Sequence, residues 1–246
     1  MMPQSLSKSL NILRQEGLFE LLRQIYLHFH LRKRFFRHPA FLKIWSIYLR
    51  WKRLRNPDRY TDANPFKTIT VNPTEIEYTV TNIPCEWGTV VGGSWRRMRI
   101  IEKDRHQILK QHFVDGKSWV ELPIDTELGR QKDILYHRIK KDGYLSQQEL
   151  EAERSLLSLR DTEIGAGIDQ DGAIVHVGKG QHRLSIAKLL QLEQIPVQVR
   201  VRHTDWQHIR NEIRTTDSKI YLSNRAKNSI GHPDLNDLLK EKNWDD

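Results

Sequence analysis

One short segment of the chain combines two glycines with three basic side chains. Its residues are Gly178, Lys179, Gly180, Gln181, His182 and Arg183. A strand that ends in glycines and leads directly into a helix leaves amide N–H groups pointing outward, and the start of the helix carries partial positive charge. The glycines allow close approach of an oxyanion, and an arginine can contact a phosphate through two N–H groups. The segment therefore predicts a site for a phosphate ester or a nucleotide.

A structural explanation of the same segment stays open beside this one. Glycines between a strand and a helix are common tight-turn residues. A His-Arg pair in the first helical turn can also be simply solvated. The spacing alone does not separate a binding loop from a turn.

The residues around segment 178–183 predict a β-hairpin, a helix and a strand. Residues 164–168 and 173–177 are β-prone runs on either side of Asp171-Gly172, a dipeptide that supplies the positive φ angles of tight hairpin turns. Hydrophobic periodicity predicts a helix over 181–190 and an alternating strand over 195–202. These elements would present the glycine segment at the end of a sheet.

Upstream of the hairpin, two further β-prone runs are expected to join the sheet. Residues 68–71 predict a strand, and Asn72 followed by Pro73 is typical of a helix start, with Asn72 as N-cap. Residues 89–91 predict a short strand that ends at Gly92-Gly93. We therefore expect an α+β fold with a mixed sheet.

Residues 172–197 resemble the second motif of the ParB/sulfiredoxin superfamily. That motif consists of a strand, a Gly-x-x-Arg helix and a strand that begins Leu-x-x-Ile-Pro-Val, which here runs from Leu192 to Val197. The sequence Gly180-Gln181-His182-Arg183 is similar to the Gly-Cys-His-Arg of sulfiredoxins and to the Gly-x-His-Arg of free-serine kinases with this fold. Residues 68–76 resemble the first motif, a strand and a short helix. Together the two motifs cover about a sixth of the chain.

This resemblance implies nucleotide binding at the helix start and a choice among several reactions. Members of the superfamily hydrolyse CTP, transfer phosphoryl groups, reduce sulfinic acids or cleave DNA. Gln181 stands where sulfiredoxins have their catalytic cysteine, so we do not expect sulfiredoxin activity. Phosphotransfer and nucleotide hydrolysis remain, with a nucleotide and its Mg²⁺ as the expected cofactor and neither zinc nor haem. The alternative is a non-catalytic DNA-binding or nuclease-like module.

A phosphotransferase also needs a carboxylate base near the acceptor hydroxyl. The candidate catalytic residues are Glu75 and Glu77, in and after the first motif, and Glu163, which precedes the hairpin. Each of these glutamates can equally be a helix cap or a surface charge. Segment 92–97, Gly-Gly-Ser-Trp-Arg-Arg, is either a second anion-binding loop or a core anchor formed by Trp95.

The pattern along the chain divides it into three parts. Residues 1–60 form a basic amphipathic helical arm, with one helix on each side of His38. Residues 66–205 form the ParB/sulfiredoxin-like domain, with a helical insertion over about 94–160. Residues 206–246 form a C-terminal helix and a polar tail.

The positive charge of the chain is concentrated in the arm. Residues 1–60 contain 13 Lys/Arg against 3 Asp/Glu, whereas the remaining residues contain 27 against 28. Basic helices with aromatic faces can lie on anionic membranes, can bind nucleic-acid phosphates, or can pack on their own domain with a solvated basic face. The sequence does not decide among these three possibilities for the arm.

The remaining composition favours a reducing compartment. Cys85 is the single cysteine, so no internal disulfide can form, and the histidines show no metal-ligand spacing, so we expect no protein-bound metal. No segment predicts a signal peptide or a spanning helix. We therefore expect a cytoplasmic protein that the arm can bring to a membrane surface.

Overall fold

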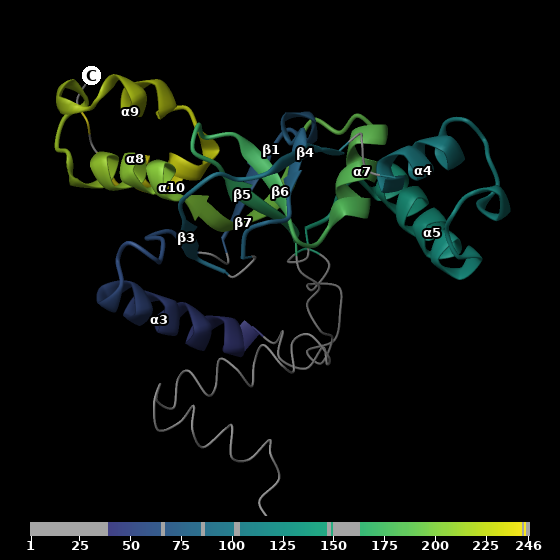
Figure 1. Ribbon diagram of the computed structural model, residues 1–246, viewed down its shortest axis with the longest axis horizontal. Helices are drawn as coiled ribbons and strands as arrows, with labels where there is room; N and C mark the ends of the chain where they lie inside the picture. Colours follow the sequence, from purple (N-terminus) through teal and green to yellow (C-terminus); the bar gives the residue numbers. More distant parts are fainter. Residues whose placement is uncertain are drawn as a thin grey trace, which may run out of the picture.

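The protein is described by a computed structural model that covers residues 39–64, 67–84, 87–100, 104–146, 149, 163–242 and 244. The first helix of the arm, Cys85 and the C-terminal end of the expected helical insertion lie outside these residues. Figure 1 shows a central sheet with helices at both of its ends and one long helix, α3, beneath it. The fold is α+β, as the sequence predicts.

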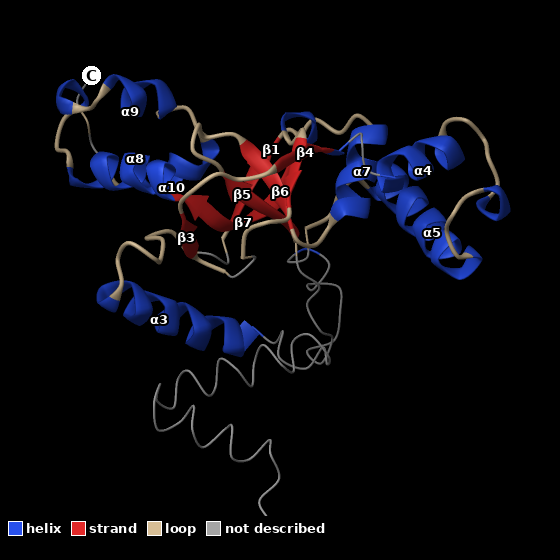
Figure 2. Cartoon of the chain, in the orientation of Figure 1, coloured by secondary structure: helices blue, strands red, loops and turns tan. Residues whose placement is uncertain are grey.

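The centre of the molecule is a seven-stranded mixed sheet (Figure 2). Its strands follow the order β1-β7-β5-β6-β2-β4, and β3 pairs with the second half of β7. Pairs β5/β7, β3/β7 and β2/β6 are parallel, whereas β1/β7, β5/β6 and β2/β4 are antiparallel. The strands are β1 Thr68–Val71, β2 Tyr78–Val80, β3 Thr89–Val91, β4 Arg97–Arg99, β5 Ile164–Ile168, β6 Ile174–Val177 and β7 Ile195–His203.

Helices and short 3-10 turns connect and flank these strands. The expected hairpin, the helix after it and the strand that follows are confirmed as β5/β6, α7 and β7. Asn72 caps a short 3-10 turn, η2, by accepting a hydrogen bond from the amide of Thr74. The helices are α3 Pro39–Arg55, α4 Asp104–Phe113, α5 Thr126–Asp142, α7 Gln181–Leu189, α8 Thr204–Thr215, α9 Asn224–Ser229 and α10 Asn236–Leu239. The 3-10 turns are η2 Pro73–Glu75, η4 Trp119–Glu121, η5 Lys219–Tyr221 and η6 Pro233–Leu235.

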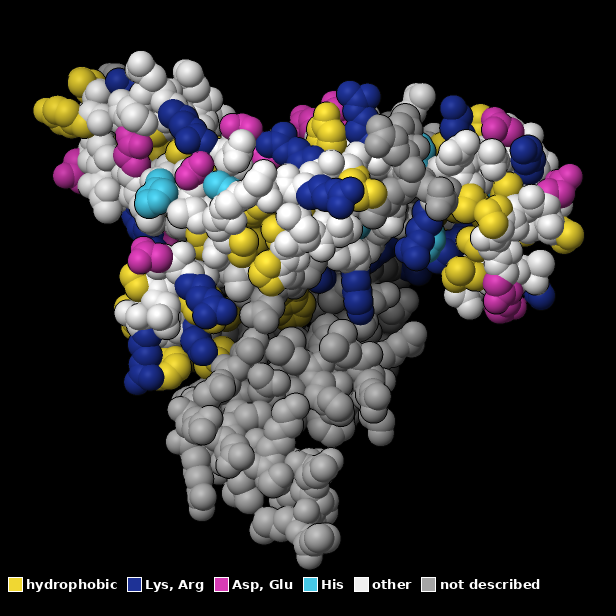
Figure 3. All heavy atoms as spheres, viewed as in Figure 1, with side chains coloured by type: hydrophobic (Ala, Val, Ile, Leu, Met, Phe, Trp, Pro, Cys, Tyr) yellow, Lys and Arg dark blue, Asp and Glu magenta, His cyan; other side chains and the backbone are white. Residues whose placement is uncertain are grey.

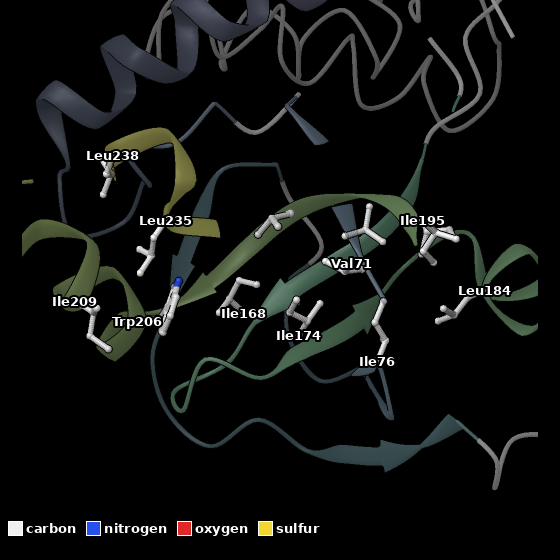
Figure 4. Close-up of a cluster of buried hydrophobic side chains, with 14 of the residues drawn as sticks. Val71, Ile76, Ile168, Ile174, Leu184, Ile195, Trp206, Ile209, Leu235 and Leu238 are labelled. Carbon is white, nitrogen blue, oxygen red and sulfur yellow. The ribbon is translucent and has the colours of Figure 1, made fainter. Parts of the chain in front are cut away.

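Strand β5 alternates large and absent side chains, and this alternation fits the two faces of the sheet. Ile164, Ala166 and Ile168 lie in the main core, which Figure 4 shows between the sheet and the helices. On the other face, a side chain at Gly165 would meet the Val177 carbonyl oxygen at 2.2 Å. Glycine is therefore needed at position 165 because another part of the backbone occupies the space of a side chain.

A β-bulge interrupts the regular alternation of β7. Ala166 pairs with Val199 and Gly167 pairs with Val201, so Arg200 has no opposite residue on β5. Val199 consequently lies in the main core, whereas Val201 lies in a smaller cluster on the opposite face. Such a bulge re-aims the side chains that follow it.

The C-terminal segment belongs to the same core as the sheet. Leu222, Leu235 and Leu238 are buried against Trp206 of α8 and the strands (Figure 4). Residues 206–246, which the sequence describes as a helix and a polar tail, thus provide one wall of the main core through α8, α9 and α10.

Buried charges attach this C-terminal wall to the rest of the protein. Asp234 accepts hydrogen bonds from Arg202 Nε and Trp206 Nε1, both at 2.9 Å, and it also contacts Arg210. Arg210 further pairs with Asp62 at 3.0 Å and with Asp237 at 2.8 Å. We call Asp62, Arg202, Arg210, Asp234 and Asp237 the paired network. Arg202 and Arg210 together hold the carboxyl pKa of Asp234 below its ordinary value despite complete burial.

The insertion forms a helical hairpin, α4 and α5, with its own hydrophobic cluster. Ile108 and Leu109 of α4, Ile139 of α5 and Trp119 between them pack against Ile186 of α7. The insertion is therefore seated on the helix that follows the glycine segment, and not on a distant edge of the sheet (Figure 1).

Helix α3 is the part of the arm that the structure describes. Its Tyr48 and Leu49 are buried together with Tyr60, and Arg53 lies 3.7 Å from Asp62. Within the described residues, no helix combines the length and the apolar character that crossing a bilayer requires.

Candidate functional site

The glycine segment adopts a backbone conformation that only glycine takes without strain. Gly178 and Gly180 have φ angles of 78° and 99°. A Cβ atom at Gly180 would lie 2.7 Å from the Cα atom of Ile164. Both the dihedral angle and the close approach therefore require glycine at position 180.

The carbonyl of Lys179 fixes the orientation of this loop. It accepts hydrogen bonds from the Gly165 amide at 2.9 Å and from His176 Nε2 at 3.3 Å. A carbonyl oxygen only accepts, so Nε2 of His176 carries the hydrogen and Nδ1 accepts from the Thr79 hydroxyl at 3.1 Å. His176 is buried and fixes the position of the loop through these two hydrogen bonds. The sequence alone did not decide whether its side chain is buried.

Helix α7 begins directly after the loop with no side chain to cap it. Its N-cap residue is Gly180, and the first helical hydrogen bond runs from the Leu184 amide to the Gly180 carbonyl. The amides of the first turn point out of the helix start, where the helix dipole is positive. Within the described part of the chain, the buried side-chain amide Nε2 of Gln181 also has no acceptor.

Three basic side chains from three helices approach one another beside the start of α7. Burial, together with the positive charges of Lys132 on α5 and Arg105 on α4, lowers the pKa of His182 to about 4. Burial and Arg105 likewise lower the pKa of Lys132. We call Arg105, Lys132 and His182 the cationic cluster. Figure 3 shows Lys and Arg side chains at the junction between the sheet and α4–α5.

The sequence did not identify Arg105 and Lys132 as site residues. They lie 77 and 50 positions before His182, on an insertion with no motif of its own. Helix periodicity could have placed both residues on helices, but it does not indicate where the two helices pack.

Arg183 and Glu163 are brought together at the loop. Arg183 Nη1 lies 3.8 Å from Glu163 Oε2 and donates to the Tyr144 hydroxyl at 3.4 Å. Both charged side chains are largely buried. One of the candidate bases thus lies beside the predicted phosphate-binding arginine.

Glu75 and Glu77 lie at the opposite end of α7. Their 3-10 turn contacts α7 through Lys188, whose Nζ donates to the Ile76 carbonyl at 2.6 Å. Lys188 follows Gln181 by seven residues, or about 10 Å of helix. Both glutamates are exposed, and the structure does not bring them to the loop.

Segment 92–97 forms a core anchor with one engaged arginine. Trp95 is buried with Val177 and Val201, which agrees with the structural alternative for this segment. Arg97 pairs with Asp169 at 2.6 Å and with Asp171 at 3.0 Å. Its charge is therefore matched by carboxylates of the β5–β6 turn.

Among the described residues, no group of three or more His, Cys, Asp or Glu side chains is placed to hold a metal ion. Comparison of the chain with family models, with curated proteins and with solved structures finds no match. The resemblance to the ParB/sulfiredoxin superfamily therefore rests on the two sequence motifs.

Proposed function

We propose that this protein is a nucleotide- or phosphate-binding protein of ParB/sulfiredoxin type. Its ligand would be a nucleotide or a phosphorylated small molecule, with the phosphate at the start of α7. The ligand's phosphate would contact the amides that follow Gly180 and the side chains of Gln181, His182 and Arg183. The observation that carries this proposal is the cationic cluster, which gathers three basic groups beside an uncapped helix start.

Gathering these basic groups is unfavourable in the ligand-free protein. Like charges disfavour one another, and the partial burial of His182 and Lys132 further disfavours their charged forms. Both effects lower the pKa values of His182 and Lys132. A bound phosphate would relieve the repulsion, accept from the Gln181 amide and raise the pKa of His182 toward its ordinary value.

Phosphoryl transfer or nucleotide hydrolysis is the reaction class that we propose for this site. Of the candidate bases, Glu163 supports it best because it contacts Arg183 at the loop. Glu75 lies at the far end of α7 and supports it least. Mg²⁺ would arrive with the nucleotide.

The test is a thermal-shift screen of the whole protein with ATP, ADP, CTP and GTP, each with Mg²⁺. We expect at least one nucleotide to raise the melting temperature of the native protein. Arg183→Ala and His182→Ala should each abolish that increase, while the ligand-free variants still melt cooperatively.

Two matched variants control for the loss of charge alone. Arg130→Ala and His208→Ala remove an exposed arginine and an exposed histidine away from the loop, and they should keep the nucleotide shift. The absence of any shift in the native protein with all four nucleotides would remove the basis of the proposal.

Helix α3 supports a second role, the docking of the protein on an anionic membrane. Ile47 and Leu54 lie seven positions apart on one side of this helix and are 67% and 84% exposed. Arg50 lies between them and is also exposed. An apolar stripe with basic neighbours fits an anionic lipid surface.

Vesicle co-sedimentation tests this second role. Vesicles with anionic lipid should retain the native protein, and Ile47→Ser combined with Leu54→Ser should release it. Ile220→Ser is the control, because it removes another exposed apolar side chain outside α3. Retention by duplex DNA that weakens steeply with salt, without vesicle binding, would instead favour the DNA-binding alternative.

A further inference from the structure

A polar cavity separate from the glycine loop lies where the C-terminal segment packs beside strand β1. Its volume is about 210 Å³, and it opens between β1, the segment before β1 and the short helix α10. Its charged lining residues are Lys67, Arg202, Asp234, Asp237 and Lys240, and Thr70 and Asn236 are among its polar ones. Loop 178–180 is not part of its lining.

Arg202 is the buried charge in the wall of this cavity. Its side chain is only 3% exposed, and it donates to both carboxylate oxygens of Asp234 through Nε and Nη2. Its third nitrogen, Nη1, has no hydrogen-bond partner among the described residues. A buried N–H group without an acceptor is unfavourable, so this guanidinium favours an additional oxygen ligand.

The carboxylates near Arg202 are already engaged. Asp234 binds Arg202 and Arg210, and Asp237 binds Arg210 at 2.8 Å. Neither carboxylate therefore provides an acceptor for Nη1.

Two exposed lysines add positive charge at the rim of the cavity. Lys67 precedes β1 and Lys240 follows α10, and the described part of the chain provides no ion-pair partner for either side chain. The lining thus carries three positive charges, from Arg202, Lys67 and Lys240, against the two negative charges of Asp234 and Asp237, and this excess favours a negatively charged occupant.

The size of the cavity limits the occupant to a small molecule. An apolar cavity of about 150 Å³ holds one benzene molecule, so this one accommodates roughly eight non-hydrogen atoms. Drug-sized ligands usually occupy about 300–1,000 Å³. A whole nucleotide exceeds this volume, so the occupant differs from the ligand proposed for the glycine loop.

We propose that this cavity is a binding site for a small oxyanion, the carboxylate or phosphate group of a compact metabolite. One oxygen of the anion accepts from Arg202 Nη1, and Lys67 and Lys240 neutralise its charge. The Thr70 hydroxyl and the side-chain amide of Asn236 offer hydrogen bonds to the remainder of the molecule. This proposal is independent of nucleotide binding at α7.

The experiment titrates the whole protein with inorganic phosphate and, separately, with succinate, and follows backbone amide signals by NMR. The Arg183→Ala variant serves as the background, so that phosphate bound at the glycine loop does not contribute. We expect saturable shifts of the Asn64, Thr68 and Thr70 amides with at least one of the two probes. Saturation by phosphate alone or by succinate alone identifies which oxyanion the cavity prefers.

Variants of the rim test whether the shifts report this site. Lys67→Ala combined with Lys240→Ala should raise the dissociation constant at least tenfold, and both side chains are exposed, so folding should be preserved. Lys117→Ala combined with Lys141→Ala removes two other exposed lysines and should change nothing. Arg202→Lys keeps the charge but loses Nη1, and a folded variant should bind at least tenfold more weakly.

Three results would overturn the proposal. The first is the absence of saturable shifts at residues 64, 68 and 70 with both probes. The second is an unchanged dissociation constant in the rim double variant. The third is a folded Arg202→Lys variant with native affinity, since it would show that Nη1 does not bind the anion.

Discussion

The cationic cluster and the paired network differ in what surrounds their basic side chains: Arg202 and Arg210 of the paired network are buried, whereas Lys132 and His182 are half-buried and Arg105 is exposed. In the paired network, Arg202 and Arg210 meet the carboxylates of Asp62, Asp234 and Asp237 at hydrogen-bonding distance. In the cationic cluster, burial and the positive charge of Arg105 lower the pKa values of Lys132 and His182, and the charge of Lys132 also lowers that of His182. The paired network supplies its own counter-ions, whereas among the described residues no carboxylate forms an ion pair with Arg105, Lys132 or His182.

This difference indicates which charges serve the fold and which serve a ligand. Removing one partner from a buried ion pair leaves an uncompensated charge and is strongly destabilising. Removing one of several like charges relieves repulsion instead. Substitutions in the paired network should therefore mainly lower stability, whereas substitutions in the cationic cluster should mainly weaken ligand binding.

The largest effect is expected from Asp234→Asn in the paired network. This variant leaves Arg202 and Arg210 facing an uncharged side chain, and we expect a loss of about 3–5 kcal/mol in the free energy of unfolding. Urea denaturation measures it. Asp115→Asn, at an exposed position, should stay within about 0.5 kcal/mol of the native protein. An equally small effect of Asp234→Asn would contradict a structural role for the network.

Acid should weaken the same network. The pKa of Asp234 is lowered in the folded protein, so its contribution is fully present above the carboxyl's ordinary pKa of about 3.9 and is lost as the pH falls below it. Between pH 4 and pH 2, the native protein should therefore lose stability more steeply than Asp234→Asn. Parallel stability curves would show that Asp234 is not the group that titrates.

The next largest effect on the free energy of unfolding is expected at the glycine loop, where the backbone conformation requires glycine. Gly180→Ala combines a φ of 99° with a Cβ only 2.7 Å from Ile164 Cα, and we expect a loss of about 2–3 kcal/mol. Gly116→Ala is matched in φ, at 74°, but its Cβ meets nothing within 4 Å. It should lose only about 1 kcal/mol, and an equal loss in both variants would exclude the close approach as the cause.

A smaller effect, on binding alone, is expected in the cationic cluster. Arg105→Gln and Lys132→Gln should each weaken nucleotide binding about tenfold, because each removes a charge-assisted contact worth about 1.5 kcal/mol. The free energy of unfolding should stay unchanged or rise slightly. A loss of stability above about 1 kcal/mol would assign the altered residue to the fold instead.

The last prediction concerns the pH dependence of stability that His182 contributes. Its pKa is about 4 in the folded protein and near 6.5 when unfolded, so stability falls as the pH decreases through this window. His182→Gln should reduce the difference in unfolding free energy between pH 7 and pH 4. Saturating phosphate should reduce it in the native protein as well, because an anion raises the pKa of His182. An unchanged difference in both experiments would show that His182 remains solvated.

Five of the seven strands could be predicted because their signals are local, whereas β2 was not predicted and β4 lies within the segment 94–160 that was expected to be a helical insertion. The Asp171-Gly172 turn, the Asn72 cap and the period of residues 181–190 each lie within a few positions of the element that they define. The bulge at Arg200 was not predictable, since it depends on Gly165 and Gly167 in a neighbouring strand. It shifts the alternation expected for residues 195–202, so that Val201 faces the cluster opposite to that of Val199.

The candidate site could be predicted only where a motif marks it. The glycine segment and Arg183 have a motif, and their proximity to Glu163 follows from the hairpin. The partners in the paired network are separated by up to 148 positions, as for Asp62 and Arg210. No local pattern connects such residues, and the same holds for the approach of Arg105 and Lys132 to His182.

The insertion at 94–160 has a consequence for chain entropy. It lies between Thr79 and His176, which form a hydrogen bond across 97 positions. Loop-closure entropy grows only with the logarithm of length, so the insertion adds about 1 kcal/mol or less to that closure. In return, it supplies two helices that cover α7 and two of the three residues of the cationic cluster. A connection between two strands can thus gain a pair of helices that face a ligand at a small cost in loop-closure entropy. The pairing of β2 with β6 is retained.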